Sequence, residues 1–247
     1  QAYEFMWLEM MREANRESLK QTEKGRSILS ILVEAPFFSA SYRFDFDKIE
    51  EIKKKIVDPS ISLVSFDLFD TLTKRKVYSP SDLFNLLEKK AIDLLAIHDI
   101  INFKQLRIEA EKKARAKSRF EEISIDEIYT ELNLVLRLPQ DKLDKLKSEE
   151  KSLEVEISQA RNFSLDLLHL ARYAGKKVVV ISDMYLPSET LRLILRKHKI
   201  EIDFLYVSSE IKKCKSTGNL YKYVQKEVGV DFENWLHIGD NVHSDYE

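Results

Sequence analysis

The chain has 247 residues, of which 44% are hydrophobic and 33% are charged, so it can bury a sizeable core in one or two domains. Its 40 Lys and Arg residues and 42 Asp and Glu residues give a formal net charge of -2 and are interleaved, which argues against a nucleic-acid-binding face. The single cysteine excludes an internal disulfide, and no apolar run approaches the roughly 18 residues of a membrane span, so we expect a protein of a reducing cytoplasm.

The two ends of the chain indicate a fragment of a longer protein. The sequence starts at Gln1, without the basic-then-apolar order of a signal peptide, and stops at Glu247 within a charged loop. Apolar residues at helical spacing predict a helical N-terminal extension over residues 1–57, whose last part is a basic helix from Asp47 to Val57.

A short apolar run follows this extension and delivers acidic residues into a turn. Leu63–Phe66 predicts a buried strand, and Asp67, Asp70 and Thr71 come directly after it. An apolar core does not need an aspartate, so the Asp67 carboxylate must be solvated, hydrogen-bonded or facing a cation. This stretch alone is compatible both with an ordinary acidic turn and with a ligand site at the carboxyl edge of a parallel sheet.

Residues 77–160 predict four helices in succession. Two apolar stripes at helical spacing come first, then a capping box formed by Ser124 and Glu127, then an amphipathic run from about 141 to 158. A crossover between parallel strands usually carries one helix. We therefore predict that residues 77–160 form an inserted α-helical cap.

From Phe163 onward, strands and helices alternate. Amphipathic helices separate three short apolar strands, which we predict at Lys177–Ile181, Phe204–Val207 and Trp235–Ile238. This alternation predicts an α/β fold with a doubly wound parallel sheet of the Rossmann type. The predicted core comprises residues 58–76 and 161–247.

Polar residues follow the predicted strands at their carboxyl ends. Asp67, Ser182 and Asp240 each stand at the end of a strand, and Lys215 follows a fourth, so a parallel sheet would gather them at one edge. An aspartate can attack phosphorus, a hydroxyl and a lysine can hold phosphoryl oxygens, and a second acid can bind Mg2+.

Four segments around these residues resemble the motifs of the haloacid dehalogenase-like (HAD) hydrolases, in order and in spacing. Each segment alone is a weak signal, but four in order at strand ends are specific. The resemblance covers about residues 61–247 and implies a HAD-like fold with an α-helical cap between the first and second motifs. The four segments are Phe66–Leu72, Ile181–Met184, Lys215–Tyr221 and His237–Asp245.

A further stretch, Asp-Met-Tyr-Leu-Pro at residues 183–187, is similar to a subgroup of HAD-like hydrolases. Members of that subgroup are often fused to, or encoded beside, glycosyltransferases. The resemblance therefore implies a glycosyltransferase as a fused or associated partner.

The resemblance also implies a role for each matching residue. The implied activity is Mg2+-dependent hydrolysis of a small phosphorylated metabolite, such as a sugar phosphate, through an aspartyl phosphate on Asp67. Lys215 would steady Asp67 and the phosphoryl group. The implied substrate-binding residues are Thr71, Ser182 and Asn241, and the implied Mg2+ ligands are Asp67, Asp240, Asp245 and the main-chain carbonyl of Phe69.

Phe69 is the departure from the pattern of the family. Phosphatases of the family usually carry a second aspartate there, as general acid for the leaving group, and losing such an acid costs about 10²–10⁴-fold in rate. Asp70 either replaces this acid or caps the loop. Two alternatives therefore stay open, a catalytically weak or non-enzymatic HAD-like module of a longer protein and a 2-haloacid dehalogenase, although dehalogenation has little use for the cation that Asp240 and Asp245 suit.

Several other polar residues have weaker claims to a role. We predict that Glu154 is a solvated helix charge and that Arg75 and Arg161 either contact an anionic substrate or face solvent. His237 is interpreted as a core histidine with satisfied hydrogen bonds, and Cys214 as an inert thiol.

Overall fold

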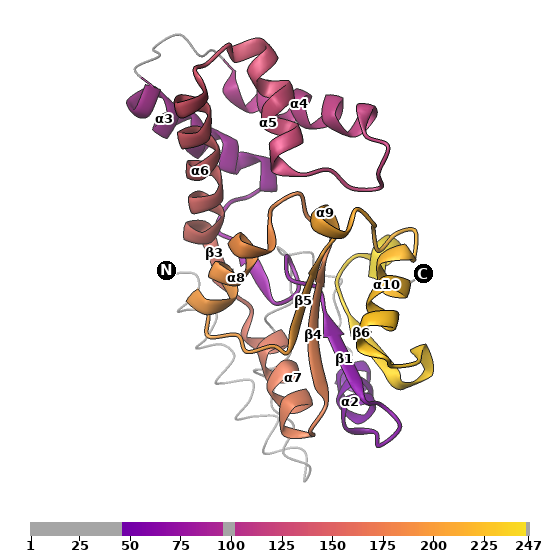
Figure 1. Ribbon diagram of the computed structural model, residues 1–247. Coiled ribbons are helices and arrows are strands. Elements are labelled where there is room, and N and C mark those ends of the chain that lie inside the picture. The colour runs from indigo at the N-terminus through magenta and orange to yellow at the C-terminus, as the bar shows by residue number, and fades with distance from the viewer. Residues whose placement is uncertain (1–45, 96–101, 246–247) are drawn as a thin grey trace, which may run out of the picture.

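The computed structural model describes residues 46–95 and 102–245. They form a parallel sheet with helices on both faces and a group of helices beyond the carboxyl ends of the strands (Figure 1). The predicted N-terminal extension lies outside the described residues except for helix α2 (Phe46–Val57), which matches the basic helix predicted there. No helix among the described residues is long and apolar enough to cross a membrane.

The sheet has the order β5-β4-β1-β6, and all of its neighbouring strands are parallel. The central strand β1 therefore has a partner on each side, so Asp67, which follows it, stands at the middle of the sheet edge. The predicted doubly wound α/β sheet is confirmed. The strands are β1 (Leu63–Phe66), β4 (Lys177–Ser182), β5 (Phe204–Val207) and β6 (Trp235–Ile238).

Alternate residues of β4 pack into two different hydrophobic clusters. Three long helices provide the other sides of these clusters: α7 (Asn162–Tyr173), α8 (Ser188–Lys197) and α10 (Asn219–Val228). Val178 and Val180 share a cluster with residues of α7 and α8, whereas Val179 and Ile181 share one with residues of α10. Because successive side chains of a strand point to opposite faces, α7 and α8 cover one face of the sheet and α10 covers the other.

The cap contains the four predicted helices: α3 (Leu83–Leu95), α4 (Phe103–Lys117), α5 (Ile125–Leu136) and α6 (Gln140–Ile157). The predicted capping box opens α5, since the Glu127 carboxylate accepts the Ser124 amide at 2.8 Å and the Ser124 hydroxyl accepts the Glu127 amide at 3.4 Å. Shorter helices complete the fold: η2 (Pro80–Asp82), α9 (Ser208–Ile211), η3 (Phe232–Asn234) and α11 (Val242–Asp245).

Two strands of three residues each, which the sequence did not predict, join the cap to the core. β2 (Thr73–Arg75) and β3 (Ser158–Ala160) pair antiparallel at the base of the cap. Lys197 of α8 strengthens this junction because its ammonium donates hydrogen bonds to main-chain carbonyls at the end of α6 and the start of β3. The accepting carbonyls belong to Val155, Glu156 and Ser158, at 2.6, 2.8 and 3.0 Å.

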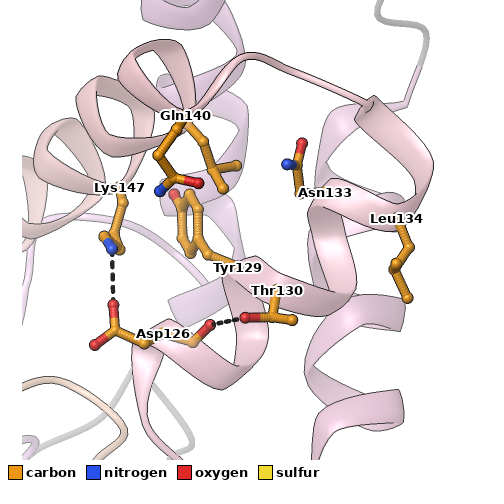
Figure 2. A pocket seen from close by; sticks show the side chains of 8 residues that line it. Asp126, Tyr129, Thr130, Asn133, Leu134, Gln140 and Lys147 are labelled. Carbon is orange, nitrogen blue, oxygen red and sulfur yellow. Dashed lines mark hydrogen bonds and ion pairs between the residues drawn. The ribbon is translucent and has the colours of Figure 1, made fainter.

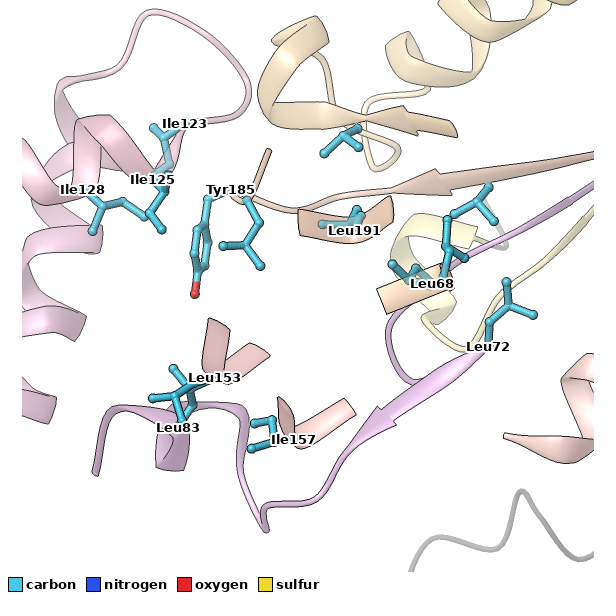
Figure 3. Close-up of a cluster of buried hydrophobic side chains, with 14 of the residues drawn as sticks. Leu68, Leu72, Leu83, Ile123, Ile125, Ile128, Leu153, Ile157, Tyr185 and Leu191 are labelled. Carbon is cyan, nitrogen blue, oxygen red and sulfur yellow. The ribbon is translucent and has the colours of Figure 1, made fainter. Parts of the chain in front are cut away.

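One hydrophobic cluster continues from the sheet into the cap (Figure 3). Tyr185, in the loop after β4, lies near Ile125 and Ile128 of α5, and its carbonyl accepts the Ile125 amide at 2.9 Å. Leu68 and Leu72 belong to the same cluster on the sheet side. The cap is therefore packed against the core through a residue that the core provides.

A buried ion pair lies at the centre of the cap. Arg107 donates to Glu150 through Nη2 and Nε, at 2.7 and 2.9 Å, and both side chains are 0% exposed. Tyr129 donates its hydroxyl to Glu150 at 2.9 Å, and the Arg107 guanidinium lies 4.9 Å from the ring centre of Tyr185. Burial alone would lower the pKa of Arg107, but Glu150 beside it raises that pKa above its ordinary value, so the arginine stays charged.

Removing only the cation of this pair should destabilise the protein strongly. Arg107→Met leaves Glu150 buried without a counter-charge, so we expect the free energy of unfolding to fall by about 3–5 kcal/mol in urea denaturation followed by circular dichroism. The double variant Arg107→Met/Glu150→Leu should recover most of that loss, because no charge is then left buried.

Lys117→Met provides the matched control. It breaks the pair between Lys117 and Glu131, in which the lysine is 62% exposed, and should cost less than about 1 kcal/mol. A loss in Arg107→Met as small as the loss in this control would contradict the assigned importance of the buried pair.

Candidate active site

Lys215 lies between two carboxylates at the carboxyl edge of the sheet. Its ammonium donates to Asp67 Oδ1 at 2.8 Å and to Asp245 Oδ1 at 2.6 Å. Lys215 is 4% exposed and Asp67 is 7% exposed. Burial alone would lower the pKa of Lys215, but the two carboxylates raise it above its ordinary value, so the lysine is a cation.

Asp67 is held directly after β1, where its amide donates to the Ile238 carbonyl at 2.9 Å. Burial raises the pKa of Asp67 to about 7, against the effect of Lys215, and the nearby Asp245 and Asp240 carboxylates add to the increase. A carboxyl group that titrates near neutral pH beside a cation, at the ligand-binding edge of a parallel sheet, is a candidate catalytic residue.

Asp245 is positioned by a chain of side chains that runs into the sheet. Burial would raise its pKa, but His237 and Lys215 hold it below its ordinary value, so Asp245 is ionised and can only accept hydrogen bonds. His237 Nε2, 3.2 Å from Asp245 Oδ1, therefore carries the ring proton, and its Nδ1 accepts from the Ser65 hydroxyl at 2.7 Å. Ser65 in turn accepts the Trp235 indole N–H at 2.7 Å. His237 is thus hydrogen-bonded on both sides, as expected, and it also orients Asp245.

Gly239 lets the Asp245 carboxylate approach the backbone. A Cβ atom at position 239 would lie 2.2 Å from Asp245 Oδ2, so no larger residue fits without displacing the carboxylate. The same Oδ2 accepts the backbone amide of Asn241 at 3.0 Å. Asn241 thus reaches the site through its backbone, and the predicted contact of this residue with substrate stays a prediction.

Thr71 and Asp240 bring the loops after β1 and β6 together. The Thr71 hydroxyl donates to Asp240 Oδ1 at 3.0 Å. Ser182 is buried as the last residue of β4, the neighbour of β1 in the sheet. The predicted hydroxyl groups therefore come from segments that end at the same edge as Asp67.

The donor atoms at this edge suit Mg2+, which prefers oxygen ligands and binds through one or two carboxylates and several waters. Within the described residues, the hydrogen bonds to Asp67 and Asp240 engage Oδ1 of each side chain and no bond engages Oδ2. The Oδ2 atoms of Asp67 and Asp240 are thus of the type that would hold a Mg2+ ion. Both carboxylate oxygens of Asp245 accept hydrogen bonds from protein groups, one of them from Lys215. Its contacts therefore indicate a role in holding Lys215 before any role in holding a metal ion.

No complete set of metal ligands is preformed in the part of the chain that the structure describes. Among residues 46–95 and 102–245, no group of three His, Cys, Asp or Glu side chains is placed to hold a metal ion. Waters and a substrate would have to supply the remaining ligands, and the predicted roles of Asp245 and the Phe69 carbonyl in metal binding stay predictions.

Phe69, where the resemblance to the HAD family implies a general acid, is covered by an ion pair between core and cap. The Arg75 guanidinium lies 4.2 Å from the ring centre of Phe69 and donates to Glu154 through Nε and Nη2, at 2.9 and 3.2 Å. The Arg75 and Glu154 side chains are 10% and 3% exposed. The prediction that Glu154 is a solvated helix charge is wrong, because Arg75 comes from the opposite connection of the cap and pairs with it there.

Asp70 adopts a left-handed backbone conformation, with φ 58°, which few residues other than glycine tolerate. Its carbonyl accepts a hydrogen bond from the Arg161 guanidinium, so Arg161 contacts the loop after β1. Partial burial raises the pKa of the Asp70 carboxyl, Arg75 and Arg161 oppose that increase, and Asp240 adds to it. The role of Asp70 as a substitute acid stays a prediction.

Comparisons with known proteins identify the fold. No protein-family model and no curated protein sequence matches the chain. Many solved structures are similar to it, two of which illustrate the likeness. One is a 2-haloacid dehalogenase from Pseudomonas syringae pv. Tomato DC3000, at 17% identity over 75% of this chain and 80% of that one, with a TM-score of 0.54. The other is the HAD-hydrolase YfnB from Bacillus subtilis bound to magnesium, at 15% identity over 75% and 82%, with a TM-score of 0.53.

The chain has the HAD-like fold. The four segments that resemble the HAD motifs meet at the carboxyl edge of the sheet. At these identities the similarity extends to the fold alone, so the glycosyltransferase partner stays a prediction.

Asp183 also lies at the carboxyl edge of the sheet, and it was not among the site residues predicted from the sequence. Both of its carboxylate oxygens accept the Lys215 backbone amide, at 3.0 Å each, and burial raises the pKa of Asp183 to about 6. It therefore holds the loop of Lys215 from the core side. The available signal was its position, since Asp183 directly follows a strand as Asp67 does.

A cavity of about 460 Å3 lies in the cap (Figure 2). Its lining comes from α5 and α6 and includes Tyr129, Asn133 and Lys147. Lys147 forms an ion pair of 2.7 Å with Asp126 there. None of the strand-end residues lines this cavity, so the candidate active site rests on the cluster around Lys215.

The raised pKa of Asp67 predicts a pH-dependent loss of stability in the metal-free protein. The carboxyl titrates near 3.8 in the unfolded chain and has a pKa of about 7 in the fold, so between these values the folded state holds a proton that the unfolded state has lost. The contribution of Asp67 to stability should therefore fall as the pH rises from about 4 to about 7 and then level off.

Asp67→Asn removes this dependence. Measured by thermal unfolding in EDTA, the Tm of Asp67→Asn minus that of the wild type should increase from pH 5 to about pH 7 and stay constant above it. Asp166→Asn, on the exposed side of α7, should keep a constant difference and serves as the control. A difference for Asp67→Asn that does not vary with pH would refute the raised pKa.

Proposed function

We propose that this protein is a Mg2+-dependent hydrolase, specifically a phosphatase that acts on a small phosphorylated metabolite such as a sugar phosphate. The observation that carries the proposal is the buried Lys215 between Asp67 and Asp245. This arrangement supplies a carboxylate nucleophile and a fixed cation for phosphoryl oxygens at the ligand-binding edge of the sheet.

In the first step, the Asp67 carboxylate attacks phosphorus. A bond forms between a carboxylate oxygen and phosphorus, the bond from phosphorus to the leaving oxygen breaks, and that oxygen takes a proton from Asp70 or from water. Lys215 offsets the negative charge of the phosphoryl oxygens, and Asp245 keeps the ammonium aligned. Thr71 and Ser182 supply hydroxyl groups near those oxygens.

In the second step, water attacks the aspartyl phosphate at phosphorus. The bond between phosphorus and the Asp67 oxygen breaks, the carboxylate is restored, and phosphate leaves with the remaining proton passing to Asp70 or to solvent. When bound, Mg2+ supplies positive charge that reduces the repulsion between the carboxylates and the phosphoryl group. Asp67 and Asp240 would hold it.

The first experiment measures phosphate release from p-nitrophenyl phosphate and from a panel of sugar phosphates, with and without Mg2+. We expect Mg2+-dependent release by the wild type and a loss of about 10³-fold or more in Asp67→Asn, because the nucleophile is removed. Asp166→Asn should retain wild-type activity. Unchanged activity in Asp67→Asn would overturn the assignment of Asp67.

A second candidate function is 2-haloacid dehalogenation, and the observation that favours it is Phe69 at the position of the acid. Halide leaves from carbon without a proton, so a site in which Asp67 attacks carbon and water then hydrolyses the ester needs no such acid. One solved structure with this fold is a 2-haloacid dehalogenase. The pairing of Asp240 with Thr71 beside Asp67 supports phosphoryl transfer instead, since it adds an acid that suits a cation.

Chloride release from 2-chloropropionate in EDTA separates the two candidates. We expect the wild type to release no more chloride than Asp67→Asn, because the three carboxyl groups at the edge suit a cation and repel an anionic haloacid. Chloride release by the wild type alone, in the absence of Mg2+, would replace the phosphatase proposal with dehalogenation.

A non-enzymatic module of a longer protein is the remaining alternative. If the wild type shows neither turnover nor Mg2+-dependent binding of beryllofluoride, which resembles a phosphoryl group, this alternative is favoured. We include a glycosyltransferase partner and a cytoplasmic location in the proposal because the sequence predicts them.

A further inference from the structure

The loop between α4 and α5 of the cap descends toward the loop that carries Lys215 (Figure 1). Glu121 in the cap loop accepts four hydrogen bonds from residues 214–219. Its Oε2 accepts the Cys214 amide at 2.8 Å and the Thr217 hydroxyl at 2.7 Å, and its Oε1 accepts the side-chain amide of Asn219. Its main-chain carbonyl accepts the Cys214 thiol at 3.2 Å.

The Lys215 loop is therefore held from two sides through consecutive backbone amides. The amide of Cys214 donates to Glu121 of the cap, and the amide of Lys215 donates to Asp183 of the core. Both acceptors are carboxylates, and hydrogen bonds to charged acceptors are about twice as strong as those between neutral groups.

Neighbouring contacts seat the same cap segment on the core. The Lys212 ammonium donates to Glu127, the capping-box residue of α5, at 2.7 Å. The Ser208 hydroxyl lies 3.4 Å from the buried carboxylate of Glu122. Glu121 thus belongs to a segment that docks on the loops after β5, and it is the member of that segment with direct contacts on both sides of Lys215.

We propose that Glu121 is a positioning residue for Lys215. The cap carboxylate fixes residues 214–219, and the lysine reaches Asp67 in the correct geometry only while this cap segment is docked. The catalytic consequence rests on the proposed function, whereas the effect on the loop does not.

The test compares Glu121→Ala and Glu121→Gln with Glu131→Ala as the matched control. Glu131 is a cap glutamate whose ion pair, with Lys117 at 2.6 Å, stays inside the cap. With p-nitrophenyl phosphate and Mg2+, Glu121→Ala should lower kcat by about 10- to 100-fold and leave KM within about threefold of the wild type. The reason is that a misplaced lysine weakens stabilisation of the transition state more than it weakens binding of the substrate. Glu121→Gln keeps an acceptor for the Cys214 amide and should recover part of the loss.

Hydrogen exchange at the Lys215 amide provides a readout that does not need turnover. This amide donates to Asp183, so Glu121 is not its acceptor, and faster exchange in Glu121→Ala would report release of the whole loop. We expect faster exchange in Glu121→Ala, an intermediate rate in Glu121→Gln and the wild-type rate in Glu131→Ala.

The outcomes separate this inference from the proposed function. Faster Lys215 exchange together with a lower kcat supports the positioning role, whereas an unchanged kcat in an active enzyme, or a lower kcat with unchanged exchange, overturns it. If the wild type shows no turnover, the proposed function fails, and exchange alone decides. Faster exchange in Glu121→Ala then supports the hold on the loop, and unchanged exchange refutes it.

Discussion

The buried ammonium of Lys215 constrains the whole carboxyl edge of the sheet. A buried charge is costly unless it is paired, and Lys215 meets this requirement with Asp67, 148 residues away, and Asp245, 30 residues away. Pairing the charge of this one lysine therefore brings the loops after β1, β5 and β6 together. The dependence is mutual, because Asp67 is itself buried beside two other carboxyl groups and Lys215 is the cation that opposes their repulsion.

The partners of Lys215 are fixed by the sheet beneath them. Asp245 rests on the chain from His237 through Ser65 to Trp235, and its approach to the backbone depends on the missing side chain of Gly239. In a buried network of this kind, displacing one member leaves the others without partners, which is more costly than losing a single exposed hydrogen bond. The sheet thereby transmits its rigidity to the candidate nucleophile.

Local sequence signals predicted the sheet well and the long-range pairs poorly. Phe204–Val207 and Trp235–Ile238 form strands with the predicted bounds because each is a short apolar run between polar turns. β2 and β3 have three residues each and show no periodicity. Arg107 and Glu150 lie 43 residues apart on helices whose charges resemble a solvated face, so nothing in the sequence pairs them. The strand ends were predictable because parallel strands gather their carboxyl ends, whereas the left-handed Asp70 and the cap contact of Glu121 depend on tertiary structure.

The cap contacts the surroundings of Asp67 at two separate places. On one side, Glu154 of α6 pairs with Arg75, whose guanidinium covers the Phe69 ring. On the other side, Glu121 holds the loop of Lys215. A movement of the cap would therefore disturb the Phe69 side and the Lys215 side of Asp67 together. Since Phe69 has no proton to give and Glu154 neutralises Arg75, protonation of a leaving group at this edge would fall to Asp70 or to water.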